Sequence, residues 1–252
     1  MDLGHFLLVA LAGLVAGSIN AVVGSGTLIT YPVLLSLGLS PVVANGTNSV
    51  GLSVGGVASA VPYAPMLRPR ARILVPLTLL AMAGGALGAW LVVSLPAKVF
   101  TAIVPWLIIS AVALVAFQPL IAKALRQRPR HPLHRSKDLP FWAAVMGTYG
   151  GYFGAGQGVM YMAILGLRYD DDIQQVNAAK NLLGSLANIA AACVFIITGF
   201  MSWPFAIALW GGSIAGGYFG SHGAQRIPRT ALRIIVMAVG LYAAGYLFVT
   251  SR

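Results

Sequence analysis

Residues 147–188 read GTYGGYFGAGQGVMYMAILGLRYDDDIQQVNAAKNLLGSLAN, and this stretch decides the fold. It begins with a glycine-dense turn, around Gly154 and Gly156, inside a short apolar segment. The next apolar segment carries Lys180 and Asn181 within its hydrophobic run. A broken backbone and a buried lysine are both costly in lipid. Keeping both in so apolar a stretch indicates that they have a function.

The same pattern occurs earlier in the chain. Three segments of the first half match segments of the second half at an offset of 130 to 133 residues: 17–26 with 147–156, 43–51 with 176–184, and 83–88 with 215–220. The chain is therefore two copies of one unit. We place the first copy at residues 1–122, a basic linker at residues 123–138, and the second copy at residues 139–252.

The composition indicates an integral membrane protein. The 252 residues are 58% hydrophobic and 8% charged, whereas soluble domains carry about 25% charged residues. The net charge of +11 comes from bases that lie mostly in short loops, which is typical of membrane topology and not of nucleic-acid binding. No carboxylate lies in the middle of an apolar run, since the acidic residues are Asp2, Asp138, Asp170, Asp171 and Asp172.

The charge pattern also predicts the topology. A spanning helix needs about 20 apolar residues, and six segments qualify: 41–65, 73–95, 99–122, 173–198, 203–223 and 230–250. Basic loops near residues 68–72 and 226–229, and the linker, are expected in the cytoplasm. The uncharged loop at residues 199–202 is expected outside, although its counterpart in the first copy is the basic loop. The two copies are therefore predicted to have opposite orientations, with both termini in the periplasm.

Two further apolar segments, residues 6–39 and 141–167, are predicted to be hairpins that turn at the glycines. Opposite orientation needs an odd number of full spans per copy, which three helices and one re-entrant or broken hairpin provide. Hairpin legs of about 14 residues reach roughly 20 Å, past the midplane but not across the bilayer. The predicted fold is an all-α polytopic membrane protein with two inverted-topology repeats.

The glycine turns are the first candidate for a binding site. They would leave backbone N–H groups free where the second leg of each hairpin starts, near Gly26 and Gly156, and helix N-termini bind anions. Inverted-repeat transporters use broken helices in this way. The alternative is that these glycines only allow close helix packing. We interpret the regularly spaced glycines within full spans as packing positions: Gly84, Gly88, Gly212, Gly216 and Gly220.

Lys180 is the second candidate, about 12 Å along a helix from Asp172. Its amine either extends back to the membrane surface or faces a cavity, where polar groups or an anionic ligand would be its partners. The polar residues around it either line that cavity or form hydrogen bonds between helices. The candidate substrate-binding residues are Ser25, Gly26, Asn45, Thr47, Asn48, Gly156, Gln157, Asn177, Lys180, Asn181 and Ser185.

Other chemistry has less support. The acidic triplet at residues 170–172 is expected to cap the next helix, and no nearby histidine suggests a metal site. No cofactor is predicted. Residues 51–55 read GLSVG, a G-x-S-x-G motif of hydrolases, so an intramembrane serine hydrolase using Ser53 is the competing hypothesis. Every histidine lies at a segment end or in the linker, and we therefore expect no enzyme.

The glycine turns, the Pro41-x-x-x-Asn45-Gly46-Thr47 segment, the Lys180–Asn181 pair and the repeat itself resemble the sulfite exporter TauE/SafE family of permeases. The resemblance covers nearly the whole chain. It implies a multi-pass transporter of the bacterial inner membrane that moves sulfite, sulfonates, sulfoacetate-like compounds or other small anions. The expected partners are a small anionic substrate and the lipid bilayer, with no nucleic acid.

Overall fold

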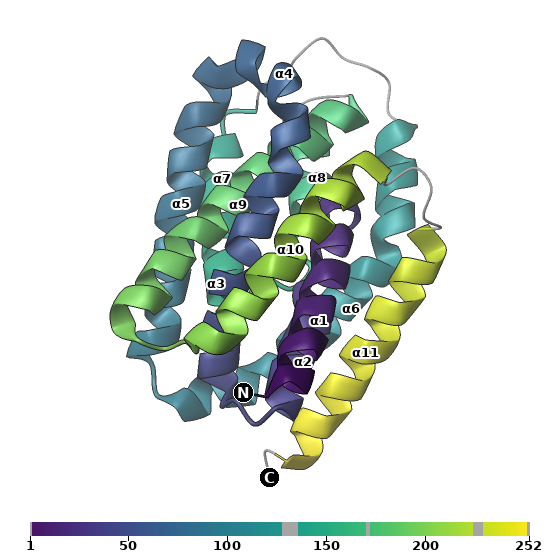
Figure 1. Ribbon diagram of the computed structural model, residues 1–252. Helices are drawn as coiled ribbons and strands as arrows, with labels where there is room; N and C mark the ends of the chain where they lie inside the picture. Colours follow the sequence, from purple (N-terminus) through teal and green to yellow (C-terminus); the bar gives the residue numbers. More distant parts are fainter. Residues whose placement is uncertain (1, 128–135, 170–171, 224–228, 251–252) are drawn as a thin grey trace.

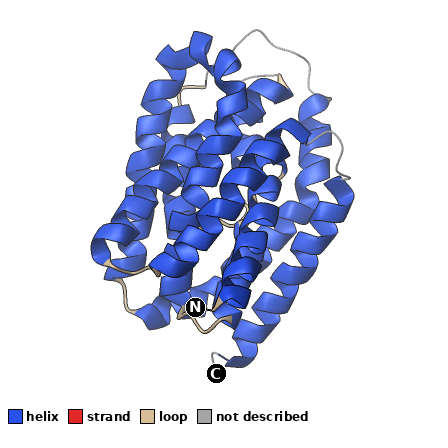
Figure 2. Ribbon diagram, viewed as in Figure 1, coloured by secondary structure: helices blue, strands red, loops and turns tan. Residues whose placement is uncertain are grey.

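A computed structural model shows an all-helical protein, as the sequence predicts (Figures 1 and 2). It describes residues 2–127, 136–169, 172–223 and 229–250, and these ranges contain no strand. The helices are α1 (Leu3–Val22), α2 (Thr27–Ser36), α3 (Pro41–Ala60), α4 (Ala64–Leu67), α5 (Ala71–Ser94), α6 (Ala97–Arg126), α7 (Leu139–Tyr152), α8 (Gln157–Arg168), α9 (Ile173–Thr198), α10 (Trp203–Gly223) and α11 (Arg229–Thr250). Two short 3₁₀ helices, η1 (Val61–Tyr63) and η2 (Arg68–Arg70), flank α4.

The outer surface of this bundle is apolar. Large hydrophobic side chains such as Leu11, Trp106 and Ile197 are exposed on different helices, which a lipid environment accommodates and water does not. In the described part of the chain, four stretches are long and apolar enough to cross a membrane: Leu3–Val22, Pro41–Ser94, Ala97–Leu125 and Ile173–Thr198. The chain is therefore a polytopic membrane protein.

Basic residues gather at one end of the bundle. Helix α4 and the end of α6 lie at the upper end in Figure 1, whereas α1 begins and α11 ends at the lower end. Arg68, Arg70 and Arg72 accompany α4, and Lys123 lies in the last turns of α6. We call this upper end the basic end. The charge pattern predicts that it faces the cytoplasm.

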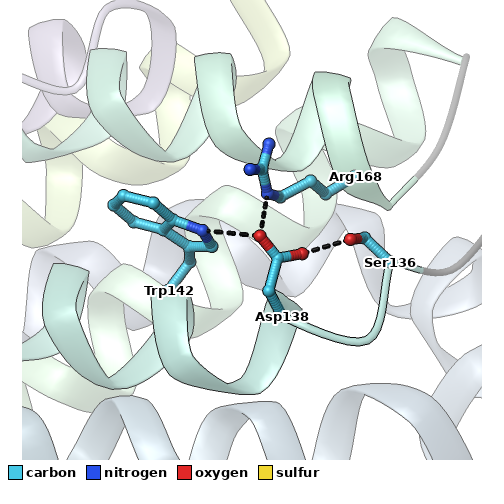
Figure 3. Close-up of polar contacts among 4 residues, drawn as sticks. All are labelled: Ser136, Asp138, Trp142 and Arg168. Carbon is cyan, nitrogen blue, oxygen red and sulfur yellow. Dashed lines mark hydrogen bonds and ion pairs between the residues drawn. The ribbon is translucent and has the colours of Figure 1, made fainter.

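The second glycine turn joins two short helices into a hairpin. Asp138 directly precedes α7, and Arg168 ends α8. Arg168 Nε donates to Asp138 Oδ2 at 2.8 Å, Trp142 Nε1 donates to the same oxygen at 2.9 Å, and Ser136 Oγ donates to Oδ1 (Figure 3). The two outer ends of the hairpin are thus held together. Helices α7 and α8 therefore enter and leave at one end of the bundle.

The first glycine turn separates α1 from α2 in the same way, but the legs are unequal. Helix α7 has 14 residues and α8 has 12, close to the predicted leg length, whereas α1 has 20 and α2 has 10. The extra length of α1 precedes the repeated unit. Leu3 to Leu8 are exposed, and the first buried residue, Val9, is the counterpart of Leu139 at the start of α7.

Glycines bring helices from the two halves of the chain into direct backbone contact. Helix α5 packs on α7, and α10 packs on α1. A Cβ at Gly88 would lie 2.0 Å from Thr148 O, and one at Gly216 would lie 2.0 Å from Leu14 O. The nearest backbone atoms would lie 2.2 Å from a Cβ at Gly84, 1.8 Å from one at Gly212 and 2.7 Å from one at Gly220. The predicted packing role of these glycines is confirmed.

Two predicted boundaries shift for local reasons. The span predicted at residues 41–65 ends as α3 at Ala60, and η1, α4 and η2 follow. Three prolines in this segment, Pro62, Pro65 and Pro69, lack the N–H that a continuing α-helix needs. Helix α6 continues to Arg126 and so enters the predicted linker, of which residues 128–135 lie outside the described residues.

The glycine contacts predict a large difference between two chemically identical substitutions. We expect Gly88→Ala to destabilise the protein by about 1–3 kcal/mol, because the added methyl group meets the backbone of α7. Gly211→Ala on α10 meets nothing within 4 Å and is expected to be neutral or to stabilise by up to about 1 kcal/mol. Thermal unfolding in detergent measures both. Equal midpoints for the two variants would contradict the packing argument.

The Asp138 cluster predicts a stability difference that depends on pH. Hydrogen bonds from Ser136 and Arg168 lower the pKa of Asp138 from 3.8 to about 2. The stabilisation is therefore fully present above the ordinary pKa and is lost as the pH falls toward about 2. We expect the unfolding midpoints of wild type and Asp138→Asn to differ by a constant amount between pH 7 and pH 5 and to converge below about pH 4. A difference that grows on acidification would contradict this assignment.

Candidate functional site

A small polar cavity lies between the two glycine turns. Its volume is about 50 Å³, enough for a few water molecules or one small oxyanion. The walls come from the end of α1, the start of α2, and helices α3, α8 and α9. The lining residues are Asn20, Gly24, Thr27, Leu52, Gly56, Ser59, Gly154, Gln157, Gly158, Tyr161, Lys180, Asn181, Gly184, Ser185 and Asn188.

The two hairpins touch at this cavity through glycine. Gly158 N donates to Gly24 O at 3.1 Å, and a Cβ on Gly24 would lie 2.4 Å from Gly158 Cα. Gly24 also has a φ of +84°, which a residue with a side chain adopts only with strain. Any larger residue at this crossing would separate the hairpins and open the wall of the cavity.

Lys180 lines the cavity from α9. The residue is 3% exposed and its Nζ atom is buried, so the amine does not reach the membrane surface as a snorkelling lysine would. Lys180 is the only cation among the residues that line the cavity, and none of those residues is Asp or Glu. The cavity therefore offers a positive charge to a ligand without a competing carboxylate.

Three further side chains supply hydrogen-bond donors. Asn181 Nδ2 is buried and has no hydrogen-bond partner among the described residues. Asn20 Oδ1 accepts from Gly26 N at 2.6 Å, which leaves its amide group as the donor. Thr27 Oγ1 accepts from Asn48 Nδ2 at 3.2 Å, so its hydroxyl hydrogen is available to the cavity. These groups suit an anion with several acceptor oxygens.

The expected free N–H groups at the second legs are mostly occupied. At the start of α8, Gln157 N donates to Gly154 O and Val159 N to Gly156 O, while Gly158 N donates across to Gly24. The start of α2 is similar, since Gly26 N donates to Asn20. Tight turns satisfy their own amides because unsatisfied ones are costly in a membrane. Side chains, more than the backbone, therefore face the cavity.

Four predicted site residues line the cavity: Gln157, Lys180, Asn181 and Ser185. Seven others do not line it: Ser25, Gly26, Asn45, Thr47, Asn48, Gly156 and Asn177. Most of these seven residues instead form the glycine turns or make hydrogen bonds between helices.

Three of the seven tie α3 to other elements. Asn48 binds both Thr27 and Thr30 of α2. Asn45 Nδ2 donates to the carbonyl of Tyr152, the last residue of α7, at 2.9 Å. Thr47 Oγ1 accepts from Ser202 N, before α10, at 2.9 Å.

The other four lie at the turns or near the basic end. Gly156 has a φ of +73° and forms the N-cap of α8, while Gly26 is the N-cap of α2. Ser25, which precedes Gly26, is buried, and its hydroxyl has no partner among the described residues. Asn177 Nδ2 donates to Tyr63 Oη at 2.9 Å, which ties α9 to η1.

Several cavity residues were not predicted. Asn20 and Thr27 flank the first glycine turn, and Tyr161 lies one turn into α8. On α3, Leu52, Gly56 and Ser59 follow helical spacing, so a search for one helical face would have found them. Gly158 and Gly184 carry no polar side chain and offered no chemical signal.

The competing hydrolase motif does not form a site. Ser53 Oγ donates to Val50 O within α3 at 2.7 Å, and the residue does not line the cavity. Of the acidic triplet predicted to cap α9, Asp172 does so by accepting from Gln174 N at 2.9 Å, and residues 170 and 171 lie outside the described residues. In the described ranges, no three His, Cys, Asp or Glu residues are grouped as a metal site would require.

A bundle of apolar helices that encloses a polar cavity between two broken hairpins is the architecture of a membrane transporter. The model of the family described as "Sulfite exporter TauE/SafE" matches residues 9–247. The chain belongs to this family, which is a transporter family and not an enzyme family.

Curated relatives agree with this class over nearly their full length. A "Probable membrane transporter protein" of Haemophilus influenzae is 32% identical, covering 94% of this chain and 92% of the relative. The "Probable membrane transporter protein ORF9" of Sinorhizobium sp is 26% identical, covering 96% and 93%. The "Probable membrane transporter protein YfcA" of Escherichia coli K12 is 28% identical, covering 95% and 88%. No solved structure matches the chain.

The site predicts that alanine substitution has different effects at Asn48 and Asn181, which match in the sequence repeat. Asn48→Ala would leave Thr27 and Thr30 without their partner, and we expect a loss of about 1–3 kcal/mol of stability. Asn181→Ala removes a donor that has no described partner, so stability should stay within about 0.5 kcal/mol of wild type while anion affinity falls. Thermal unfolding and ligand titration separate the two effects. A large loss of stability in Asn181→Ala would contradict the assignment.

Proposed function

We propose that this protein carries small sulfur-containing or organic anions, such as sulfite, sulfonates or sulfoacetate, across the bacterial inner membrane, most simply as an exporter. The observation that carries the proposal is the composition of the cavity. One lysine and several amide and hydroxyl donors converge there, and no carboxylate lines the walls. A cation would find no charged ligand in such a site, whereas an oxyanion would find both charge and donors.

The proposed anion-binding residues contribute charge and hydrogen bonds from different helices. Lys180 supplies the full positive charge, and the amide of Asn181 comes from the next position of the same helix. Asn20 and Thr27 approach from the first hairpin, on the far side of the glycine contact. Because the side chains of Lys180, Asn181 and Thr27 are buried, the local dielectric is low and each charge-assisted hydrogen bond is stronger than in water. The anion thus bridges elements from both copies.

The size of the cavity favours a compact ligand. About 50 Å³ suits a sulfite-sized oxyanion, whereas a longer sulfonate would require the walls to move. Gly56 and Gly184 line the cavity without side chains, so their backbones limit its width. We therefore place compact oxyanions first among the candidate substrates.

Alternating access follows from the inverted repeat that we infer from the sequence. The contacts that support it are reciprocal, since each copy packs one full helix on the hairpin of the other. Gly56 of α3 contacts Ser185 of α9, whereas Gly46 contacts Phe195, so these two matching helices run antiparallel. A two-fold axis in the membrane plane has this effect on equivalent helices.

We infer that this conformation is an inward-facing state of the transport cycle. Ser59 lies near the end of α3 and Lys180 near the start of α9, so the cavity extends toward the basic end. The opposite half is closed by the bonds from Asn45 to Tyr152 and from Ser202 to Thr47. An outward-facing state would break these bonds and close the cavity on the other side.

Charge also bears on coupling. Proton-coupled carriers often place a carboxylate inside the membrane, and this sequence has none in the middle of an apolar run. We therefore propose anion movement without obligatory proton exchange. An inside-negative potential would drive export, since expelling one net negative charge gains about 2.3 kcal/mol per 100 mV.

The test is anion binding and flux in variants of Lys180. Lys180→Met should abolish anion binding, because a dehydrated anion would be left with dipoles alone. Lys180→Arg should keep part of it, because the charge remains. Proteoliposomes with imposed potentials, with and without a pH gradient, report flux for sulfite, sulfoacetate and simple carboxylates. Wild-type binding in Lys180→Met would refute the site, and flux that follows only the pH gradient would refute uncoupled transport.

A further inference from the structure

A second pocket lies beside the break of the first hairpin. Its volume is about 470 Å³, and it is lined by the end of α1, the last turns of α6, helix α8 and the start of α11. Val22 and Val23 form its inner wall, next to Met162, and Ala122 of α6 lies on another side. Most of this surface is apolar. The pocket is therefore distinct from the polar central cavity and is about nine times larger.

Two cations line this pocket. Lys123 comes from α6 and Arg233 from α11. The Nε of Arg233 is buried and has no hydrogen-bond partner among the described residues. The amides of Gln118 and Gln127 add hydrogen-bonding groups, and none of the described residues that line the pocket is Asp or Glu. The pocket thus combines two positive charges with mostly apolar walls.

The depth of Lys123 matches the headgroup region of a bilayer. Helix α6 begins at Ala97, and Lys123 lies about 39 Å further along the helix, whereas the hydrocarbon core is only about 30 Å thick. Lys123 therefore lies at the basic end of the bundle. Arg233 lies about 6 Å from the start of α11 at Arg229, and Val22 and Val23 lie at the break between α1 and α2.

We propose that this pocket binds an anionic phospholipid of the cytoplasmic leaflet. The phosphate pairs with Lys123 and Arg233, and an acyl chain packs against Val22, Val23 and Ala122. Basic pockets between transmembrane helices on the cytoplasmic side recognise lipid headgroups by this combination of charges and depth. The apolar walls argue against a free oxyanion, which would have no partner for most of the surface.

The bound lipid would support the break that the central cavity depends on. Val23 directly precedes Gly24, which contacts Gly158 at the crossing of the hairpins, and Met162 directly follows Tyr161 on α8. The lipid thus packs behind the inner wall of the central cavity. This role does not depend on which anion is transported.

The experiment counts bound lipid on the intact protein. Purified protein in detergent is titrated with phosphatidylglycerol or with phosphatidylcholine of the same chain length, and native mass spectrometry records the complexes. We expect the wild type to prefer phosphatidylglycerol by about thirtyfold, and Lys123→Gln/Arg233→Gln to lose that preference. The matched control, Arg72→Gln/Lys98→Gln, removes two exposed cations elsewhere and should keep it.

A second variant tests the apolar part of the pocket without touching the charges. Ala122→Trp should fill the apolar part of the pocket and weaken the binding of both lipids. Phosphatidylglycerol should also raise the thermal unfolding midpoint of the wild type more than that of either pocket variant. Four results would overturn the proposal: an unchanged preference in Lys123→Gln/Arg233→Gln, an equal loss in the control, wild-type lipid affinity in Ala122→Trp, or binding of glycerol phosphate as tight as that of the lipid.

Discussion

The backbone contact between Gly24 and Gly158 is the constraint on which the rest of the structure depends. A helix that breaks inside a membrane must have its polar groups satisfied by the protein itself, because lipid offers no hydrogen bonds. Here the two breaks satisfy part of each other's backbone hydrogen bonding, since Gly158 N donates to Gly24 O. That contact is possible only when neither residue has a side chain. The polar cavity exists because two breaks, and not one, meet at this point.

Once the breaks are in contact, the surrounding polar residues divide into two groups. Asn45, Thr47 and Asn48 form bonds that hold α2, α7 and the start of α10 against α3. Lys180 and Asn181, which match Thr47 and Asn48 in the sequence, line the cavity instead. Residues at matching sequence positions therefore have different roles, one set holding helices together and the other facing the cavity.

Long-range charge is arranged around the same centre. The carboxylates of the described residues lie at helix starts: Asp2 before α1, Asp138 before α7 and Asp172 before α9. There Asp2 and Asp172 cap helices, and Asp138 pairs with Arg168. None of the three lines the central cavity, whereas the cation Lys180 does. The apolar exterior and the basic end then set how the bundle sits in the bilayer.

Sequence reasoning alone predicts the all-α membrane class, the positions of both helix breaks, most helix boundaries, the packing glycines and the family. These features follow from local properties, since hydropathy indicates which segments lie in lipid, and glycine and proline indicate where a helix stops. Which polar residues face the cavity depends on tertiary packing and could not be predicted. Asn48 and Asn181 match in the repeat, yet the amide of Asn48 is used by threonines about 20 residues away. Asn20 and Thr27 line the cavity but were not predicted, for the same physical reason. The direction of a side chain and its hydrogen-bond partner depend on how helices that are distant in the sequence rotate and pack.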